Sequence, residues 1–223
     1  MRPLRLIIML FAASCVRQHQ DGSSGAGRAA TAGDEMTMYE LDQAEAPWGD
    51  YGAILVHGMS GHLGRSGGRI QLERTGPFIP PVTLPGLGDV IVTDKVRRAL
   101  GREVPGLVFR PVEKARIVRL DWHTWDRTAD EPPQYPQTGE PEDYILERQH
   151  DAAIAEQLGP LWELVPAVVP SIQVEGGRFN DAVYDGEDFV RADPRAGVNF
   201  VSARLMKAMS AVAAGWITFR PAR

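Results

Sequence analysis

The chain has 223 residues, of which 43% are apolar and 24% are charged, a composition typical of an ordinary soluble protein. Its formal net charge of −5 argues against a general affinity for nucleic acids or anionic membranes. The single cysteine, Cys15, excludes disulfide bridges within the chain and a metal site built from cysteines.

The start of the chain has the layout of a bacterial secretory signal. Two arginines precede an apolar run at residues 6–13, and the following AASC at residues 12–15 is similar to a lipobox in which Cys15 carries the lipid. The run is too short to span a bilayer as a helix. This interpretation of residues 1–15 predicts a periplasmic or membrane-anchored protein that touches the membrane only through its lipid.

A misassigned start is the alternative interpretation of the same stretch. Residues 16–35 are rich in Gly, Ala and Ser, and we expect a disordered linker because they lack the apolar side chains that offset ordering entropy. Patterned sequence begins next to Met36 and Met38, and a start at either residue would give a cytoplasmic protein. In both interpretations the globular domain is residues 36–223.

The pattern after residue 36 predicts strands first. Residues 38–41, 51–56 and 69–73 are expected strands, of which 51–56, YGAILV, would be buried. Five glycines make residues 58–68 an expected flexible loop between the last two strands.

Two helices have clear start and stop signals. Thr93 is an expected N-cap, apolar residues follow at helical spacing, and Gly106 ends the helix. Ser202 and Gly215 bound the second helix in the same way. Short strands are expected after each helix, at residues 107–109 and 216–219.

The middle of the chain predicts a long loop between a strand and a short helix. Four prolines interrupt residues 126–142, and loops of this length are usually functional or disordered. Asp151 is the expected N-cap of the short helix, and Gly159 is its stop. The other expected elements are a strand at 115–122, the helix at 152–158, and extended chain at 161–169 and 171–174.

The sequence is similar to itself at an offset of 109 residues, and the two copies lie near residues 67–112 and 176–222. Each copy contains an amphipathic helix followed by a strand, and an apolar helical stripe must be buried against another element. We therefore predict an α+β fold, one domain of two similar halves with a mixed or antiparallel sheet and a few packed helices. The matched residues include Gly67/Gly176, Gly68/Gly177, Pro85/Pro194, Gly88/Gly197, Val92/Val201, Ala99/Ala208 and Gly106/Gly215.

One stretch carries partial signatures of a serine hydrolase. Residues 54–58, ILVHG, resemble the strand-to-oxyanion-loop segment of α/β-hydrolases, and residues 64–68 match G-x-S-x-G with Ser66 as nucleophile. A nucleophile elbow needs a buried strand before the serine and a helix after it, and neither pattern is present around Ser66. The glycines therefore indicate a loop with positive φ angles, and an enzyme using His57 stays an alternative.

The histidines do not form a recognisable metal motif. No H-E-x-x-H or H-x-H pair exists, and the glycine-rich loop lacks the Lys-Ser/Thr of a phosphate-binding loop. We predict neither a metal site nor a cofactor. The residues considered as ligands were His57, His62, His123, His150, Asp121 and Asp151.

The region from Asp126 to Glu156 is strongly acidic, with nine carboxylates against Arg127 and Arg148. Aromatic residues of the types that anchor interfaces lie in and around it. The functional interpretation is a docking surface for a basic protein, whose approach an acidic field would speed. The alternative is a solvated acidic face whose aromatics belong to the core. The candidate partner-binding residues are Trp122, Trp125, Asp130, Glu131, Tyr135, Glu140, Glu142, Asp143 and Tyr144.

The two ends of the domain carry a family resemblance. The segments FVSARLMKAM and GWITFRPA at residues 200–222 resemble the C-terminal signature of a family of bacterial immunity proteins from polymorphic toxin systems, and MYELDQ at residues 38–43 resembles that family's start. The resemblance implies a protein that acts by binding a toxin and not by catalysis. It carries no functional residue over to this chain.

The sequence thus predicts a non-enzymatic binding protein, with an immunity protein that occludes a cognate basic toxin as the first hypothesis. A hydrolase-like enzyme using His57 and the glycine loop is the second. A lipid-anchored periplasmic protein with a structural role, attached through Cys15, is the third. No nucleic acid partner is expected, and the toxin's chemistry and the oligomeric state stay open.

Overall fold

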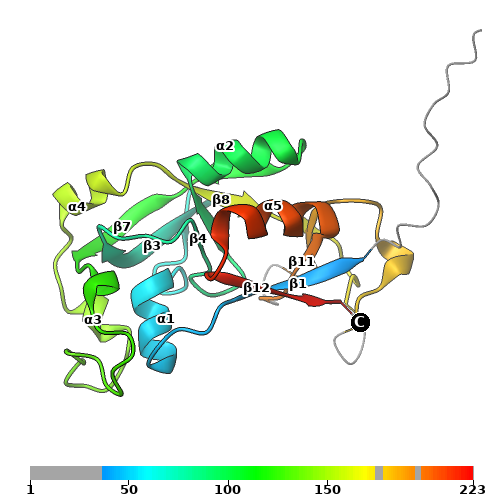
Figure 1. The fold of residues 1–223 in the computed structure, drawn as a ribbon. Coiled ribbons are helices and arrows are strands. Elements are labelled where there is room, and N and C mark those ends of the chain that lie inside the picture. The colour runs from blue at the N-terminus through cyan, green and yellow to red at the C-terminus, as the bar shows by residue number, and fades with distance from the viewer. Residues whose placement is uncertain (1–36, 174–177, 194–196, 223) are drawn as a thin grey trace, which may run out of the picture. The chain divides into compact units, whose positions relative to one another are not determined.

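The computed structural model describes residues 37–173, 178–193 and 197–222, all of which belong to one compact unit, Met36–Arg223 (Figure 1). The helices are α1 (Gly49–His57), α2 (Asp94–Glu103), α3 (Asp143–Leu146), α4 (Ala152–Gln157) and α5 (Ala203–Ala213), with short 3₁₀ helices η1 (Trp122–Thr124) and η3 (Asp181–Val183). The strands of the first half are β1 (Met38–Gln43), β2 (Arg65–Ser66), β3 (Arg69–Gly76), β4 (Val82–Thr83), β5 (Val90–Thr93), β6 (Val108–Pro111) and β7 (Glu113–Arg119). The remaining strands are β8 (Leu161–Val165), β9 (Ala167–Val168), β10 (Phe189–Arg191), β11 (Asn199–Ser202) and β12 (Ile217–Pro221).

The strands form three sheets. Their orders are β12-β1-β11-β10-β9, β2-β3-β7 and β4-β5-β8-β6. Only the pairs β3/β7 and β9/β10 are parallel, and every other pair of these strands is antiparallel. The predicted α+β class with mixed or antiparallel sheets is confirmed.

Helices α2 and α5 begin where the sequence predicts. The Thr93 hydroxyl accepts a hydrogen bond from the Val96 amide at 3.4 Å, and the Ser202 hydroxyl accepts one from the Leu205 amide at 3.1 Å. Each cap satisfies an amide that the first helical turn leaves without an intrahelical partner. The helices contact each other and lie side by side in Figure 1.

The apolar stripes of these two helices share one core. Val96 and Leu100 of α2 and Leu205 and Met209 of α5 are all buried in the same cluster. Strands from two sheets complete that cluster, including Leu41 of β1, so neither stripe faces water. Burying such side chains stabilises the fold by roughly 2 kcal/mol each.

Each of these helices also connects two strands of one sheet, and a third strand of that sheet lies between them. Strand β8 lies between β5 and β6, and strand β1 lies between β11 and β12, with antiparallel pairing throughout. In the central strands, Glu163 stands opposite Arg110 and Glu40 stands opposite Arg220, and both pairs are ion pairs. The segments LWEL and MYEL therefore occupy matching places.

A duplicated sequence would produce two matching strand arrangements of this kind. The duplication itself stays a prediction. Several residues on which the repeat was drawn, Gly176, Gly177 and Pro194, lie outside the described residues. Residues 1–35, with Cys15 and the expected signal and linker, also lie outside them. Within the part of the chain that the structure describes, no helix is long and apolar enough to cross a bilayer.

The expected buried strand at 51–56 is wrong, because these residues form helix α1. The helix starts after Trp48, which has a φ of 62°, and buries Tyr51, Leu55 and Val56 against β3 and the segment around Trp122. A run of six mostly apolar residues fits a buried strand and a buried helix equally well, so its periodicity does not separate them. Contacts with distant segments decided the outcome.

Other elements follow the predictions with shifted ends. The expected strands at 69–73, 107–109, 115–122 and 216–219 are β3, β6, β7 and β12, and the capped helix at 152–158 is α4. The glycine loop at 58–68 is less free than expected, since β2 and Met59 both pair with β3. No helix or strand interrupts residues 126–142, as predicted.

Candidate functional site

The predicted docking segment is fastened to helix α1 by side chains that precede or belong to that helix. The Trp48 indole N–H donates to the carbonyl of Ala129 at 3.0 Å, and the Tyr51 hydroxyl donates to the carbonyl of Gln134 at 2.8 Å. The rings of Tyr51 and Tyr135 lie 4.5 Å apart between centroids. A loop without helix or strand is thereby held in one place.

The candidate partner-binding residues separate into an exposed and a buried group. Trp122 and Tyr144 are 1% and 4% exposed and pack with Tyr51 and Leu55. They are core side chains, so their predicted role as interface anchors is wrong in this structure. The exposed group is Asp130, Glu131, Tyr135 and Glu140, while Trp125, Glu142 and Asp143 are half-buried.

Asp143, which is half-buried, and Tyr144, which is buried, already have interaction partners within the segment. The Asp143 carboxylate accepts a hydrogen bond from the Thr138 hydroxyl at 2.7 Å. The guanidinium of Arg148 lies 3.6 Å from the centre of the Tyr144 ring and donates to the Tyr144 carbonyl at 2.6 Å. Arg148 is thus held against Tyr144.

A hollow of about 380 Å³ lies between α1, the chain after β4 and the acidic segment. Carboxylates of Asp50, Glu140 and Glu142 line it. Its other walls include the apolar side chains of Ile54, Leu84 and Pro141. We call this the acidic hollow. Its volume lies within the range of about 300–1,000 Å³ that is usual for ligand pockets.

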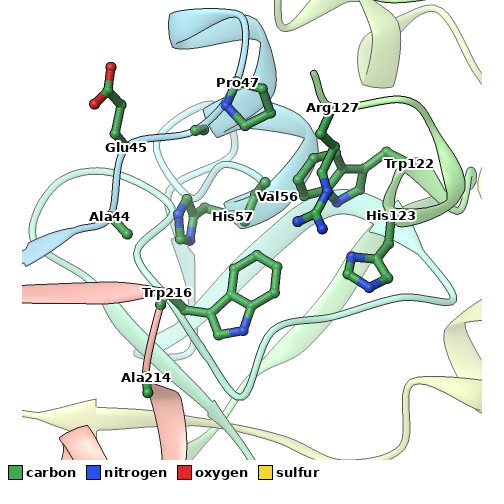
Figure 2. A pocket seen from close by; sticks show the side chains of 12 residues that line it. Ala44, Glu45, Pro47, Val56, His57, Trp122, His123, Arg127, Ala214 and Trp216 are labelled. Atoms are coloured by element: carbon green, nitrogen blue, oxygen red, sulfur yellow. The ribbon is translucent and has the colours of Figure 1, made fainter. Parts of the chain in front are cut away.

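A second cavity, of about 270 Å³, opens between the chain before α1, η1 and the turn after α5 (Figure 2). Its lining includes the aromatic residues His57, Trp122, His123 and Trp216, and its charged residues are Glu45 and Arg127. We call it the aromatic pocket. His57 lines both cavities, so this residue stands between the acidic hollow and the aromatic pocket.

His57 is buried and neutral. Its Nδ1 accepts a hydrogen bond from the Leu84 amide at 3.2 Å, so the neutral ring carries its proton on Nε2 and can donate there. Burial, together with the charge of Arg74, lowers the pKa of His57 to about 4. At neutral pH this imidazole is a hydrogen-bond donor without charge.

Arg74 is a fully buried cation behind the wall that Val56 forms. Its guanidinium donates to the carbonyls of Thr75 at 2.8 Å and of Val56 and Phe78 at 3.1 Å each. Its Nη1 has no hydrogen-bond partner among the described residues. Burial lowers the pKa of Arg74 to about 9, which leaves it charged at neutral pH. A buried charge normally has a counterion, and none of its hydrogen-bond partners is a carboxylate.

The structure does not bring the residues of the hydrolase signature together. Ser66 lies exposed on the two-residue strand β2, and among the described residues no hydrogen bond joins it to a histidine. The neighbouring Arg65 binds Asp89 and Glu163 at 2.8 Å each. The predicted nucleophile and His57 therefore belong to separate surroundings.

The histidines considered as metal ligands are dispersed. His62 Nδ1 lies 2.7 Å from the buried carboxylate of Glu73, and His150 Nδ1 accepts from the Ile117 amide at 3.1 Å. His123 stacks on Phe78 with 4.4 Å between ring centroids. Among the residues that the structure describes, no group of three His, Cys, Asp or Glu could hold a metal ion.

Sequence reasoning missed several residues that line the two cavities. Asp50 lies just before the predicted strand at residues 51–56 and has no predicted role, and Trp216 is predicted only as part of a strand. Arg127 appears in the sequence only as a counter-charge of the acidic segment. The unusual density of tryptophan and histidine at residues 122–125 was the one local signal that could have indicated the aromatic pocket.

Comparison with protein-family models finds no match, and no curated protein or solved structure matches the chain.

Proposed function

We propose that the protein is a non-enzymatic binding protein that docks a basic protein partner, and that it acts as an immunity protein by occluding a cognate toxin. The observation that carries this proposal is the acidic hollow, where Asp50, Glu140 and Glu142 meet beside a segment fastened to α1. The resemblance of residues 38–43 and 200–222 to immunity proteins supplies the class of partner.

The hollow suits a lysine or arginine side chain of the partner. Ile54, Leu84 and Pro141 offer apolar contact to an aliphatic stem, and the carboxylates can pair with the cationic end. The fastening by Trp48 and Tyr51 lowers the entropy that the loop loses on binding. Exposed Asp130 and Glu131 extend the acidic field beyond the hollow and speed the approach of a basic protein.

The test neutralises the hollow in the triple variant Asp50→Asn, Glu140→Gln, Glu142→Gln. The candidate partner to be tested is the product of the adjacent gene, made as an inactive variant. We expect association to slow at least tenfold at low salt, with a smaller effect at high salt because screening weakens the field. Growth protection on co-expression with the active toxin should fall in parallel.

The control carries the same change in net charge on another surface, in the triple variant Glu103→Gln, Glu113→Gln, Glu156→Gln. All three of these side chains are exposed. Both triple variants should unfold at nearly the wild-type temperature, because five of the six side chains are exposed and exposed charges contribute little to stability. Equal association rates for the two variants would contradict the proposed docking site.

A further inference from the structure

The loop at residues 85–89, beside the acidic hollow, presents a leucine to solvent. Leu87 is 58% exposed, and the two residues before it, Pro85 and Gly86, line the hollow. We infer that Leu87 is an apolar anchor of the docking surface, and that the basic partner places a lysine or arginine in the hollow and an apolar pocket over Leu87. This inference rests on the proposed function for the existence of the partner, and it adds an apolar contact to the charged one.

Leu87 occupies a turn position at which a leucine is strained. The Asp89 amide donates to the Gly86 carbonyl at 2.9 Å, which closes a turn with Leu87 and Gly88 as its central residues. Their φ values are 52° and 69°. Turns with positive φ at both central positions are dominated by Gly, Asn and Asp, because a larger side chain is crowded in this region.

Burial does not offset this strain. Leu87 is more than half exposed and belongs to none of the apolar clusters that the described residues form. A single exposed leucine is common on protein surfaces and by itself indicates nothing. A strained backbone position is different, because such positions persist where the surrounding structure enforces them and concentrate at functional sites.

Two buried polar side chains from the C-terminal part of the chain enforce the shape of the loop. Arg191, which is 4% exposed, donates to the carbonyl of Leu87 at 3.4 Å and also to the carbonyl of Gly88. The side-chain Nδ2 of Asn199, which is 1% exposed, donates to the same Gly88 carbonyl. Side chains that bind the backbone on both sides of a residue fix its direction.

The glycine loop holds the other end of the turn. The Ser60 amide donates to the Pro85 carbonyl at 3.0 Å, and the Ser60 hydroxyl donates to the carbonyls of Pro85 at 3.3 Å and of Gly86 at 3.4 Å. Ser60 is itself buried. A loop that is fixed before binding loses little entropy when a partner covers it, so burial of Leu87 in the complex would contribute to affinity with a small opposing cost.

The carboxylates next to Leu87 select the charge of the partner. Asp50, Glu140 and Glu142 form no ion pair within the described residues. A partner cation in the hollow would therefore find them free. The field of these charges acts on the approach of the partner, whereas an apolar anchor acts on the lifetime of the complex.

The test measures association and dissociation rates of the full chain with the inactive product of the adjacent gene. We expect Leu87→Asn to speed dissociation at least tenfold and to leave the association rate unchanged, because the charge of the surface is the same. Neutralising the hollow should slow association instead. Val108→Thr replaces another exposed apolar residue, outside the lining of the hollow, and should change neither rate.

Thermal unfolding tests the strain at Leu87 without any partner. Leu87→Asn should unfold at the wild-type temperature or above it, because asparagine tolerates positive φ better than leucine does. Unfolding several degrees lower would assign Leu87 to the fold and overturn the inference. A wild-type dissociation rate in Leu87→Asn would overturn the inference and leave the proposed function standing. A wild-type chain that does not bind the adjacent-gene product would overturn both.

Discussion

At the scale of single residues, His57 is notable because it lines both cavities. It was singled out in the sequence as part of a hydrolase-like segment, and the structure gives it a different place. Its Nδ1 is occupied by the Leu84 amide, and its ring is buried between the acidic hollow and the aromatic pocket. A buried neutral imidazole of this kind makes the stability of the fold depend on pH.

We predict that the protein loses stability on acidification from pH 6.5 to pH 4, through His57. Its pKa is about 4 in the folded protein against an ordinary 6.5, so between these values the unfolded chain takes up a proton that the folded protein does not. Acid therefore favours unfolding, by up to about 3 kcal/mol near pH 4. Denaturant unfolding at several pH values measures this.

The variant His57→Asn isolates the contribution. Asparagine offers an acceptor to the Leu84 amide and does not titrate. The stability of the variant should therefore change less over this pH range than that of the wild type. His123→Asn replaces an exposed histidine and should follow the wild-type curve. Parallel curves for wild type and His57→Asn would show that the buried imidazole does not titrate as described.

At the scale of elements, helix α1 links the core to the acidic segment. Its buried face holds Tyr51 among Val118, Trp122 and Tyr144, and the Tyr51 hydroxyl reaches the carbonyl of Gln134. Burial raises the pKa of Tyr51 to about 12, so the hydroxyl remains a donor at neutral pH. The segment is a loop in secondary structure and is nonetheless anchored to an element of the core.

We predict that Tyr51→Phe loosens the acidic segment with little effect elsewhere. The lost hydrogen bond to Gln134 is worth about 1 kcal/mol, while the ring stays in the core. Hydrogen exchange at residues 129–137 should speed up several-fold. Tyr184→Phe removes a similar bond, to the Glu187 carbonyl at 2.8 Å, and should leave this segment unchanged. Unchanged exchange in Tyr51→Phe would show that the bond does not hold the loop.

At the scale of the whole molecule, the N-terminal strand β1 completes a sheet whose other strands, β9 to β12, come from the C-terminal part of the chain. It pairs with β11 on one side and β12 on the other, and its Met38 and Leu41 are buried. Residues that are far apart in the sequence also meet at Gly88, where an added Cβ would lie 2.8 Å from the Gly197 backbone. The side-chain Nδ2 of Asn199 donates to the Gly88 carbonyl at 2.8 Å.

We predict opposite results for two truncations. A chain that begins at Met36 should unfold at the same temperature as the full chain, because residues 16–35 lack an apolar pattern that could pack. A chain that begins at Ala44 lacks β1 and should show no cooperative unfolding, since β11 and β12 lose their shared partner. Thermal unfolding followed by circular dichroism measures both. Cooperative unfolding of the shorter chain near the wild-type temperature would contradict the central role of β1.

The sequence by itself determined the features that depend on near neighbours. Thr93, Ser202 and Asp151 cap helices because each side chain reaches an amide three residues along. The stripes of α2 and α5 follow from helical spacing, and the density of carboxylates after Asp126 could be counted directly. For these reasons the α+β class and most element positions were predictable.

Only the tertiary structure decided what depends on distant segments. Residues 51–56 are a helix because their apolar side chains pack on β3 and around Trp122. Trp122 and Tyr144 are core residues for the same reason, which no local pattern distinguishes from surface anchors. The two cavities and the unpaired indole nitrogen of Trp122 likewise arise where segments that are distant in the sequence meet. Whether a side chain is buried depends on the segments that pack around it. For these side chains, those segments come from distant parts of the chain.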